Sequence, residues 1–226
     1  MAPGTLSLVG TPIGNLGDIT LRALEALKSA AVIAAEDTRR TGLLLKKYGI
    51  STPMVSLHEH NEKTRAAELV RRLQGGESVA LVTDAGMPVV SDPGAWLVSR
   101  AAEAGIPMTA VPGPSAVVTA LALSGFRGER FRFEGFPPKK SAAMERWLES
   151  LAGEEAAVVC YESPYRVVKT LEAIRKVLGE VPVVVARELT KLHEELTRGS
   201  TSQVLRRYTE RPAKGEITLI FCPKKP

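Results

Sequence analysis

Residues 82–94 read VTDAGMPVVSDPG and begin at the end of an apolar run. They contain two carboxylates, two glycines and two prolines. The apolar run, residues 78–83, is typical of a buried parallel strand. The turn after such a strand presents backbone amides and carbonyls at the carboxyl edge of a sheet, where α/β proteins bind ligands. The segment therefore predicts a binding site before it predicts any particular ligand.

A second cluster of charged residues occurs at residues 35–40, which read AEDTRR and lie between an expected strand and an expected helix. Acids at a helix start complement the helix dipole, and arginines often bond such acids, so one interpretation is a structural cap. In the other interpretation an arginine such as Arg39 holds a phosphate while Glu36 or Asp37 faces the reacting group. The sequence leaves both interpretations open.

Small and polar residues also stand at other expected strand ends. These segments are VPGPSA at 111–116, YESPYR at 161–166, ARELTK at 186–191 and KGE at 214–216. Each alone is an ordinary turn, but together they are typical of the lining of a cleft between two α/β lobes. The loop at 10–18, GTPIGNLGD, has the wrong glycine spacing for a dinucleotide fingerprint, so a nucleotide-phosphate enzyme has little support.

Strand-like and helix-like segments alternate along the chain. In the first half the expected strands are 5–9, 31–35, 54–57, 78–83 and 108–111, and the expected helices are 21–28, 38–47, 63–74 and 95–104. This alternation predicts a mainly parallel sheet with helices on both faces. In the second half it is less regular, with strands near 130–134, 156–161, 183–187 and 216–221 and helices near 142–151, 165–177 and 201–208.

The length of 226 residues and the composition, 44% hydrophobic and 24% charged, are those of an ordinary globular α/β protein. The turn at 111–114, with Ser115 as a helix cap, predicts two α/β domains at 1–114 and 115–226. The net charge of +5 lies wholly in the second half, which favours a polyanionic partner, although solubilising side chains would give the same excess.

No apolar run is long enough for a membrane span, and no signal peptide is recognisable, so we expect a soluble cytoplasmic protein without membrane partners. Cys160 and Cys222 are far apart in the sequence and match no zinc or redox spacing, so no metal site is expected.

These motifs, in this order, resemble the tetrapyrrole methylase superfamily of S-adenosylmethionine-dependent methyltransferases. The resemblance runs nearly end to end through GTPIGNLGDIT, AAEDTRRTGLLL, TDAGMPVVSDPG, VPGPSA, FEGFPPKK, YESPYR, ARELTKLHEE and KGE. Within the superfamily it is greatest to the branch that methylates the 2′-oxygen of a cytidine in 16S ribosomal RNA. Many corrin-pathway relatives read GGDP where this chain reads TDAGMP, and EDTRR and FPPKK also point to the RNA branch.

The resemblance implies two α/β domains with S-adenosylmethionine in the cleft between them, in a homodimer that acts on 16S RNA or the small ribosomal subunit. Position by position, the residues it implies for cofactor binding are Pro12, Asp84, Ala85, Gly86, Pro88, Ser115 and Ala116 in the first set of motifs, and Tyr161, Leu189, Lys214 and Gly215 in the second domain. Asp84 would suit a cationic cofactor and its ribose hydroxyls.

Methyl transfer needs little covalent help, because orienting the acceptor oxygen supplies much of the acceleration. A ribose hydroxyl is a poor nucleophile, so a group must accept its proton, and the candidates are Glu36, Asp37 and Glu216. Arg39, Arg40, Lys139 and Lys140 are the expected phosphate contacts, and Phe136 and Tyr165 could stack on a splayed base or simply belong to the core.

Two alternatives remain open. A tetrapyrrole C-methyltransferase would act on a porphyrinoid without RNA. A non-catalytic RNA-binding assembly factor would bind RNA whether or not the cofactor is present, and would give no methylated product.

Overall fold

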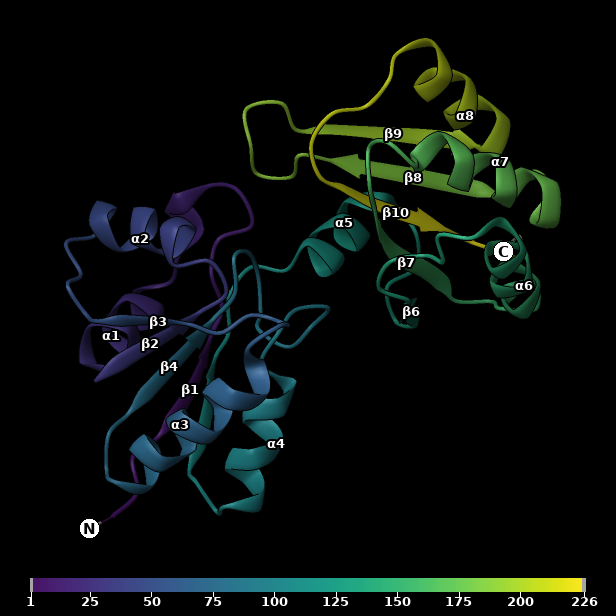
Figure 1. Cartoon of the computed structure of the whole chain (residues 1–226). Coiled ribbons are helices and arrows are strands. Elements are labelled where there is room, and N and C mark those ends of the chain that lie inside the picture. Colours follow the sequence, from purple (N-terminus) through teal and green to yellow (C-terminus); the bar gives the residue numbers. More distant parts are fainter. Residues whose placement is uncertain (1, 225–226) are drawn as a thin grey trace. The chain divides into compact units, whose positions relative to one another are not determined.

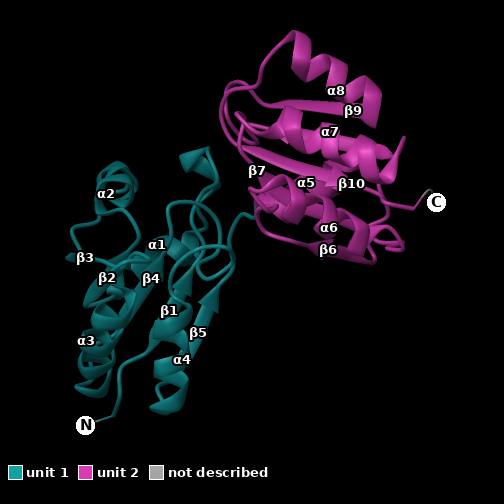
Figure 2. Ribbon diagram, turned by 45° about the vertical axis from the view of Figure 1, so that its right-hand side comes forward, with its two compact units in different colours: residues 1–115 teal, residues 116–226 magenta. Residues whose placement is uncertain are grey.

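The protein is described here from a computed structural model, which describes residues 2–224 (Figure 1). The chain forms two compact units, Met1–Ser115 and Ala116–Pro226 (Figure 2). The division predicted after Pro114 and the observed one differ by a single position. No helix among residues 2–224 combines the length and the apolar character that a membrane span requires.

Unit 1 contains a five-stranded sheet in the order β3-β2-β4-β1-β5. Its strands are β1 (Leu6–Val9), β2 (Val32–Ala35), β3 (Met54–Ser56), β4 (Val79–Val82) and β5 (Met108–Val111). All of its strand pairs are parallel, which confirms the arrangement predicted from the alternating elements. The four residues of β2 and the four of β4 are all buried, as expected for strands covered on both faces.

Helices cover both faces of this sheet. One face packs against α1 (Leu21–Ser29) and α2 (Thr38–Lys47), and the other against α3 (Glu62–Gln74) and α4 (Ala95–Glu103) (Figure 1). Because β2 leads into α2 on one face and its neighbour β4 leads into α4 on the other, the chain diverges between their carboxyl ends. A topological switch point of this kind is where open α/β sheets bind ligands.

Unit 2 contains a five-stranded sheet in the order β6-β7-β10-β8-β9. Its strands are β6 (Phe131–Phe133), β7 (Ala157–Glu162), β8 (Pro182–Arg187), β9 (Glu195–Ser200) and β10 (Ile217–Phe221). Only β6 and β7 are parallel, and β10 and β9 run antiparallel to their partners. The less regular alternation of the second half therefore corresponds to a mixed sheet.

Two elements of unit 2 lie outside the predicted ranges. Strand β9 has the polar sequence ELTRGS and a half-exposed edge position beside β8, so it lacks the apolar alternation by which strands are recognised. Helix α5 (Ala116–Ser124) is apolar around most of its circumference, so it has no amphipathic period, and the sequence predicts only its cap at Ser115.

The main core of unit 2 lies between the sheet and three helices, α6 (Ser141–Leu151), α7 (Val167–Leu178) and α8 (Thr201–Glu210). Helix α5 contacts β7, β8 and β10. Its buried residues lie outside that core, so α5 covers the opposite face of the sheet.

Candidate functional site

The loops after β1 and β4 are joined by a short two-way backbone pairing. The amide of Thr11 donates to the carbonyl of Gly86 at 2.9 Å, and the amide of Gly86 donates to the carbonyl of Thr11 at 3.1 Å. The buried hydroxyl of Thr11 also donates to the carbonyl of Thr83 at 3.0 Å. These bonds fix the position of the predicted binding segment relative to the first loop.

The loops after β1 and β5 are in direct backbone contact. A Cβ atom added to Gly10 would lie 2.7 Å from the Cα and amide nitrogen of Gly113, and one added to Gly113 would lie 2.8 Å from the Cα of Gly10. Only glycine fits at this approach. Gly86, in the loop after β4, has a φ of +84°, which also favours glycine. Three strand ends are thus held close together through their backbones.

Carboxylates join the ends of β2 and β4. Glu36 accepts hydrogen bonds from the hydroxyl of Thr83 at 2.6 Å and from the amide of Asp84 at 3.3 Å. In return, Asp84 Oδ1 accepts from the amide of Asp37 at 3.1 Å, and Arg40 Nη1 lies 3.3 Å from Asp84 Oδ2. Burial and the negative charge of Glu36 raise the pKa of Asp84, although Arg40 opposes this shift.

Asp92 is a carboxyl of this edge whose pKa is strongly raised. Its burial, together with the negative charges of Glu36 and Asp84, raises its pKa to about 6, while a hydrogen bond with Thr83 acts in the opposite direction. Such a group changes charge near neutral pH, as a general base requires. Asp92 is not among the predicted site residues, although it is the second carboxylate of the predicted binding segment.

The backbone between Asp84 and Asp92 is strained. Val89 has a φ of 76° and Ser91 a φ of 66°, although neither is glycine and Val89 is β-branched. The segment is held at its end, where Glu62 Oε1 accepts from the amides of Gly94 at 2.9 Å and Trp96 at 2.8 Å. Strain that the surrounding structure maintains is concentrated at functional sites.

Asp37 and Arg39 are paired with each other. Asp37 caps α2 by accepting from the amide of Arg39 at 2.8 Å, and Arg39 Nε and Nη2 donate to the two oxygens of Asp37 at 3.0 Å and 2.7 Å. These hydrogen bonds lower the pKa of Asp37, so it is a weak proton acceptor at neutral pH. The capping interpretation is observed, and a catalytic role for this pair stays a prediction.

In unit 2, two loops interlock at one edge of the sheet. Glu188 Oε1 accepts from the amide of Glu216 and from Lys191 Nζ, both at 2.8 Å. A Cβ atom at Gly215 would meet the side chain of Glu188, and the φ of +85° at Gly215 also favours glycine. Leu189 is buried beside this contact. Because β10 is antiparallel to β7 and β8, the loop at 214–216 shares its sheet edge with the loops after both of these strands.

The comparisons with known proteins agree over almost the whole chain. The family of Tetrapyrrole (Corrin/Porphyrin) Methylases matches residues 5–205. This chain belongs to the tetrapyrrole methylase family. A Ribosomal RNA small subunit methyltransferase I from Thermotoga maritima is 47% identical over 98% of this chain and 100% of its own length. The protein of the same name from Haemophilus influenzae is 49% identical over 96% of this chain and 78% of its own length.

Solved structures show the same fold. The uroporphyrin-III-C-methyltransferase of Thermus thermophilus aligns with a TM-score of 0.66 at 21% identity, covering 96% of this chain and 94% of that one. The methyltransferase CobJ aligns with a TM-score of 0.69 at 20% identity, covering 97% and 94%. The fold of two α/β units is therefore that of the tetrapyrrole methylases.

Within this fold, the predicted cofactor residues fall into two sets, one in each unit. Loops of unit 1 carry Pro12, Asp84, Ala85, Gly86, Pro88 and Ser115. Unit 2 carries Ala116 at the start of α5, Tyr161 in β7, and Leu189, Lys214 and Gly215 in the interlocked loops. Pro12, Gly86 and Pro88 are buried, so they shape the unit 1 loops through the backbone.

Two structural features of the unit 1 edge are missing from the sequence analysis. One is Asp92, whose signal was its place in an Asp-Pro-Gly turn after the binding strand. The other is the pair Thr11 and Thr83, which are 3% and 2% exposed and organise the loops and carboxylates. Buried threonines have no signal in the sequence, because threonine is common in both strands and loops.

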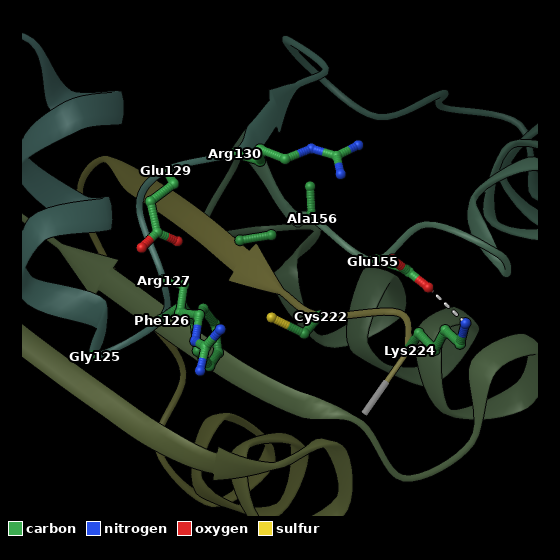
Figure 3. A pocket seen from close by; sticks show the side chains of 10 residues that line it. Gly125, Phe126, Arg127, Glu129, Arg130, Glu155, Ala156, Cys222 and Lys224 are labelled. Atoms are coloured by element: carbon green, nitrogen blue, oxygen red, sulfur yellow. Dashed lines mark hydrogen bonds and ion pairs between the residues drawn. The ribbon is translucent and has the colours of Figure 1, made fainter. Parts of the chain in front are cut away.

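A pocket of about 440 Å³ lies elsewhere in unit 2 (Figure 3). The pocket lies near the amino ends of β6 and β7. Figure 3 shows Cys222 directed into it, beside the ion pair of Lys224 with Glu155. Burial raises the pKa of the Cys222 thiol, so a reactive thiolate is disfavoured. No predicted site residue lines this pocket, which lies at the sheet edge opposite to the interlocked loops.

Proposed function

We propose that this tetrapyrrole methylase transfers a methyl group from S-adenosylmethionine to the 2′-oxygen of a cytidine ribose in 16S ribosomal RNA. The observation that carries the proposal is the near-complete alignment with relatives named Ribosomal RNA small subunit methyltransferase I, at 46% to 49% identity. The basic excess of the second half of the sequence supports an anionic substrate. A homodimer and a cytoplasmic location, implied by the family resemblance, belong to the same proposal.

The residues of unit 1 fit S-adenosylmethionine in charge and shape. Glu36, Asp84 and Asp92 gather negative charge at one sheet edge, which suits a sulfonium cation, and carboxylates also accept from ribose hydroxyls. When bound, the cofactor supplies an electrophilic methyl group.

Asp92 is the group that we propose to accept the proton of the ribose hydroxyl. With a pKa of about 6 it is ionised at neutral pH and still basic enough to take a proton. Thr83 forms hydrogen bonds with both Glu36 and Asp92, and the low pKa of Asp37 makes Asp37 a weaker base than Asp92. Glu216 forms an ion pair with Lys191 at 2.9 Å in the other unit. In this proposal Glu36 and Asp37 supply negative charge at the edge and orient the groups around it, and Arg39 is paired with Asp37.

Basic side chains in both units supply phosphate contacts in this proposal. The guanidinium side chain of Arg39 is 89% exposed and that of Arg40 is 65% exposed. Lys139 and Lys140 are exposed in the loop between β6 and α6. Cations that remain in solvent can exchange counterions for RNA phosphates, so their contribution falls with rising salt.

A labelling experiment tests the proposed function. Small ribosomal subunits lacking the modification are incubated with the full chain and tritiated S-adenosylmethionine. The expected product is 16S RNA with label on a cytidine whose 3′ phosphodiester resists alkali, because a 2′-O-methyl group blocks attack on the adjacent phosphate. Label in a porphyrinoid alone would replace the proposal with tetrapyrrole C-methylation. RNA binding without any label would identify an assembly factor.

A further inference from the structure

The loops after β6 and β7 form one continuous surface of unit 2. The two strands are parallel neighbours, so both loops leave the same edge of the sheet (Figure 1). The pairing extends into the loops, because the amide of Glu134 donates to the carbonyl of Val159 at 3.0 Å and that of Tyr161 to Gly135 at 2.8 Å. Arg166 Nη2 then donates to the carbonyls of Pro137 and Pro138 at 3.2 Å and 2.8 Å.

Each loop holds an aromatic ring in solvent. Phe136 is 60% exposed and Tyr165 is 91% exposed, although rings of this size are normally used to fill a core. Phe136 is steadied by the ring of Tyr161, with the two centroids 5.5 Å apart. Prolines follow Phe136 and precede Tyr165, so the backbone that carries each ring has few conformations to lose on binding.

The acids of these loops are directed inward, which leaves the exposed surface positive. Glu134 accepts from Trp147 Nε1 at 2.8 Å and pairs with Arg132. The Glu162 side chain is 0% exposed and accepts from Thr170, while Arg166 Nη1 lies 3.6 Å from it. Lys139 and Lys140, by contrast, are exposed.

We propose that Phe136 and Tyr165, named here the aromatic platform, stack on unpaired bases of the RNA substrate while Lys139 and Lys140 bind the flanking phosphates. This inference rests on the proposed function and adds how the substrate is recognised. Rigid rings beside solvent-exposed cations are the combination by which proteins bind single-stranded nucleic acid without reading its sequence. Glu162 and Arg166 are positioning residues that hold the two loops together.

The structure favours RNA over a protein partner because of charge complementarity. A second copy of the chain would bring its own lysines to the same surface, so like charges would face each other. An RNA loop with splayed bases brings both aromatic faces and negative charge. Duplex RNA has its bases stacked inside the helix, so it would contact the lysines and leave the rings unused.

A binding experiment with the full chain, without cofactor, separates these cases. The probes are a fluorescein-labelled RNA hairpin with an unpaired loop and a blunt duplex of the same stem. Tyr165→Ala and Phe136→Leu are each expected to weaken hairpin binding about tenfold, since stacking is lost, and to change duplex binding less than about twofold. Tyr165→Phe should bind as the wild type does, because the ring remains.

Phe131→Leu is the matched control. Phe131 is 41% exposed but begins β6, at the other end of the strand from the platform, so its replacement should leave both affinities unchanged. Equal losses for Phe131→Leu and Phe136→Leu would overturn the platform, as would unchanged hairpin binding by Tyr165→Ala. If the Tyr165→Ala or Phe136→Leu variant loses self-association but keeps hairpin binding, the surface binds a second copy of the chain, and this result would also overturn the proposed platform.

The methyl-transfer assay keeps the two proposals distinguishable. A wild-type chain that binds the hairpin through its rings but labels no RNA would retain the platform and refute the proposed function. If the Tyr165→Ala and Phe136→Leu variants label 16S RNA and bind the hairpin as well as the wild type does, the proposed function is retained and the platform is refuted.

Discussion

The loop edges of the two sheets differ in chemistry although both follow parallel strands. The edge of unit 1 gathers Glu36, Asp84 and Asp92 around buried threonines and closely approaching glycines. The edge of unit 2 beside β6 turns its acids inward and leaves lysines and aromatic rings in solvent. The chemistry of the unit 1 edge is suited to binding a small cation and accepting a proton, and that of the unit 2 edge is suited to binding a polyanion with flat bases.

The largest effect is expected from a methyl group placed where the unit 1 loops meet. Gly10→Ala would bring a Cβ to 2.7 Å from backbone atoms of Gly113, which cannot move aside cheaply. We expect methyl transfer to be abolished and the free energy of unfolding to fall by about 1–3 kcal/mol. Gly128→Ala is the control, because its Cβ would have nothing within 4 Å. Calorimetric cofactor binding and Tm check both, and a wild-type cofactor affinity in Gly10→Ala would argue against the acidic edge as the cofactor site.

Asp92→Asn tests which carboxylate of the acidic edge accepts the proton. We expect kcat to fall by about 100-fold, the usual scale for losing a general base. In the wild type, kcat/KM should rise with pH until about 6 and then level, because Asp92 must lose its proton first. Pre-steady-state methyl transfer over a range of pH measures this rise. If Asp92→Asn shows the same rise with pH, another group accepts the proton.

The raised pKa of Asp92 also has a consequence for stability. The folded protein favours the neutral carboxyl, so this group destabilises the fold increasingly as pH rises from its ordinary pKa of 3.8 through about 6. Asp92→Asn should therefore be more stable than the wild type at pH 8, by about 1 kcal/mol for a partly solvated group, and not at pH 3. Thermal unfolding at the two pH values checks the sign. A larger gain at pH 3 would contradict the assigned shift.

Asp84→Ala is expected to weaken cofactor binding about tenfold, since a charge-assisted hydrogen bond is lost at the strand end. Binding of the RNA hairpin should change much less, because the aromatic platform, Lys139 and Lys140 all belong to unit 2. Isothermal titration with S-adenosylmethionine and fluorescence titration with the hairpin measure the two affinities. Glu77→Ala, an exposed acid paired with Arg72 in unit 1, is the matched control. Equal cofactor affinity in the wild type and Asp84→Ala would remove Asp84 from the site.

The smallest effect is expected from the exposed lysines of unit 2. Replacing Lys139 and Lys140 by alanine should lower the slope of log affinity against log salt by about two, one for each phosphate contact, while the ring variants leave it unchanged. Lys46 and Lys47, at the end of α2 in unit 1, provide a control pair of equal charge. An identical slope for the wild type and the variant would refute the phosphate role of Lys139 and Lys140.

Most of unit 1 could be predicted from sequence, because its elements are local and periodic. The range predicted for α2, 38–47, and that for β5, 108–111, are the observed ones. In unit 2, β9 and the extent of α5 could not be predicted. Strand β9 is polar and is stabilised by its neighbour β8, and α5 is apolar on most sides, so neither has the period on which prediction depends.

The sequence by itself determined the family, the parallel sheet of unit 1 and the loops in which the candidate residues lie. Motifs and periodicity are properties of short segments, so one chain is enough to read them. Only the tertiary structure decided which charged groups are engaged and which are available. Asp37 is paired with Arg39, Glu162 is buried, and the pKa of Asp92 is raised to about 6. The reason is that burial and neighbouring charges set a pKa, and residues far apart in the sequence supply both.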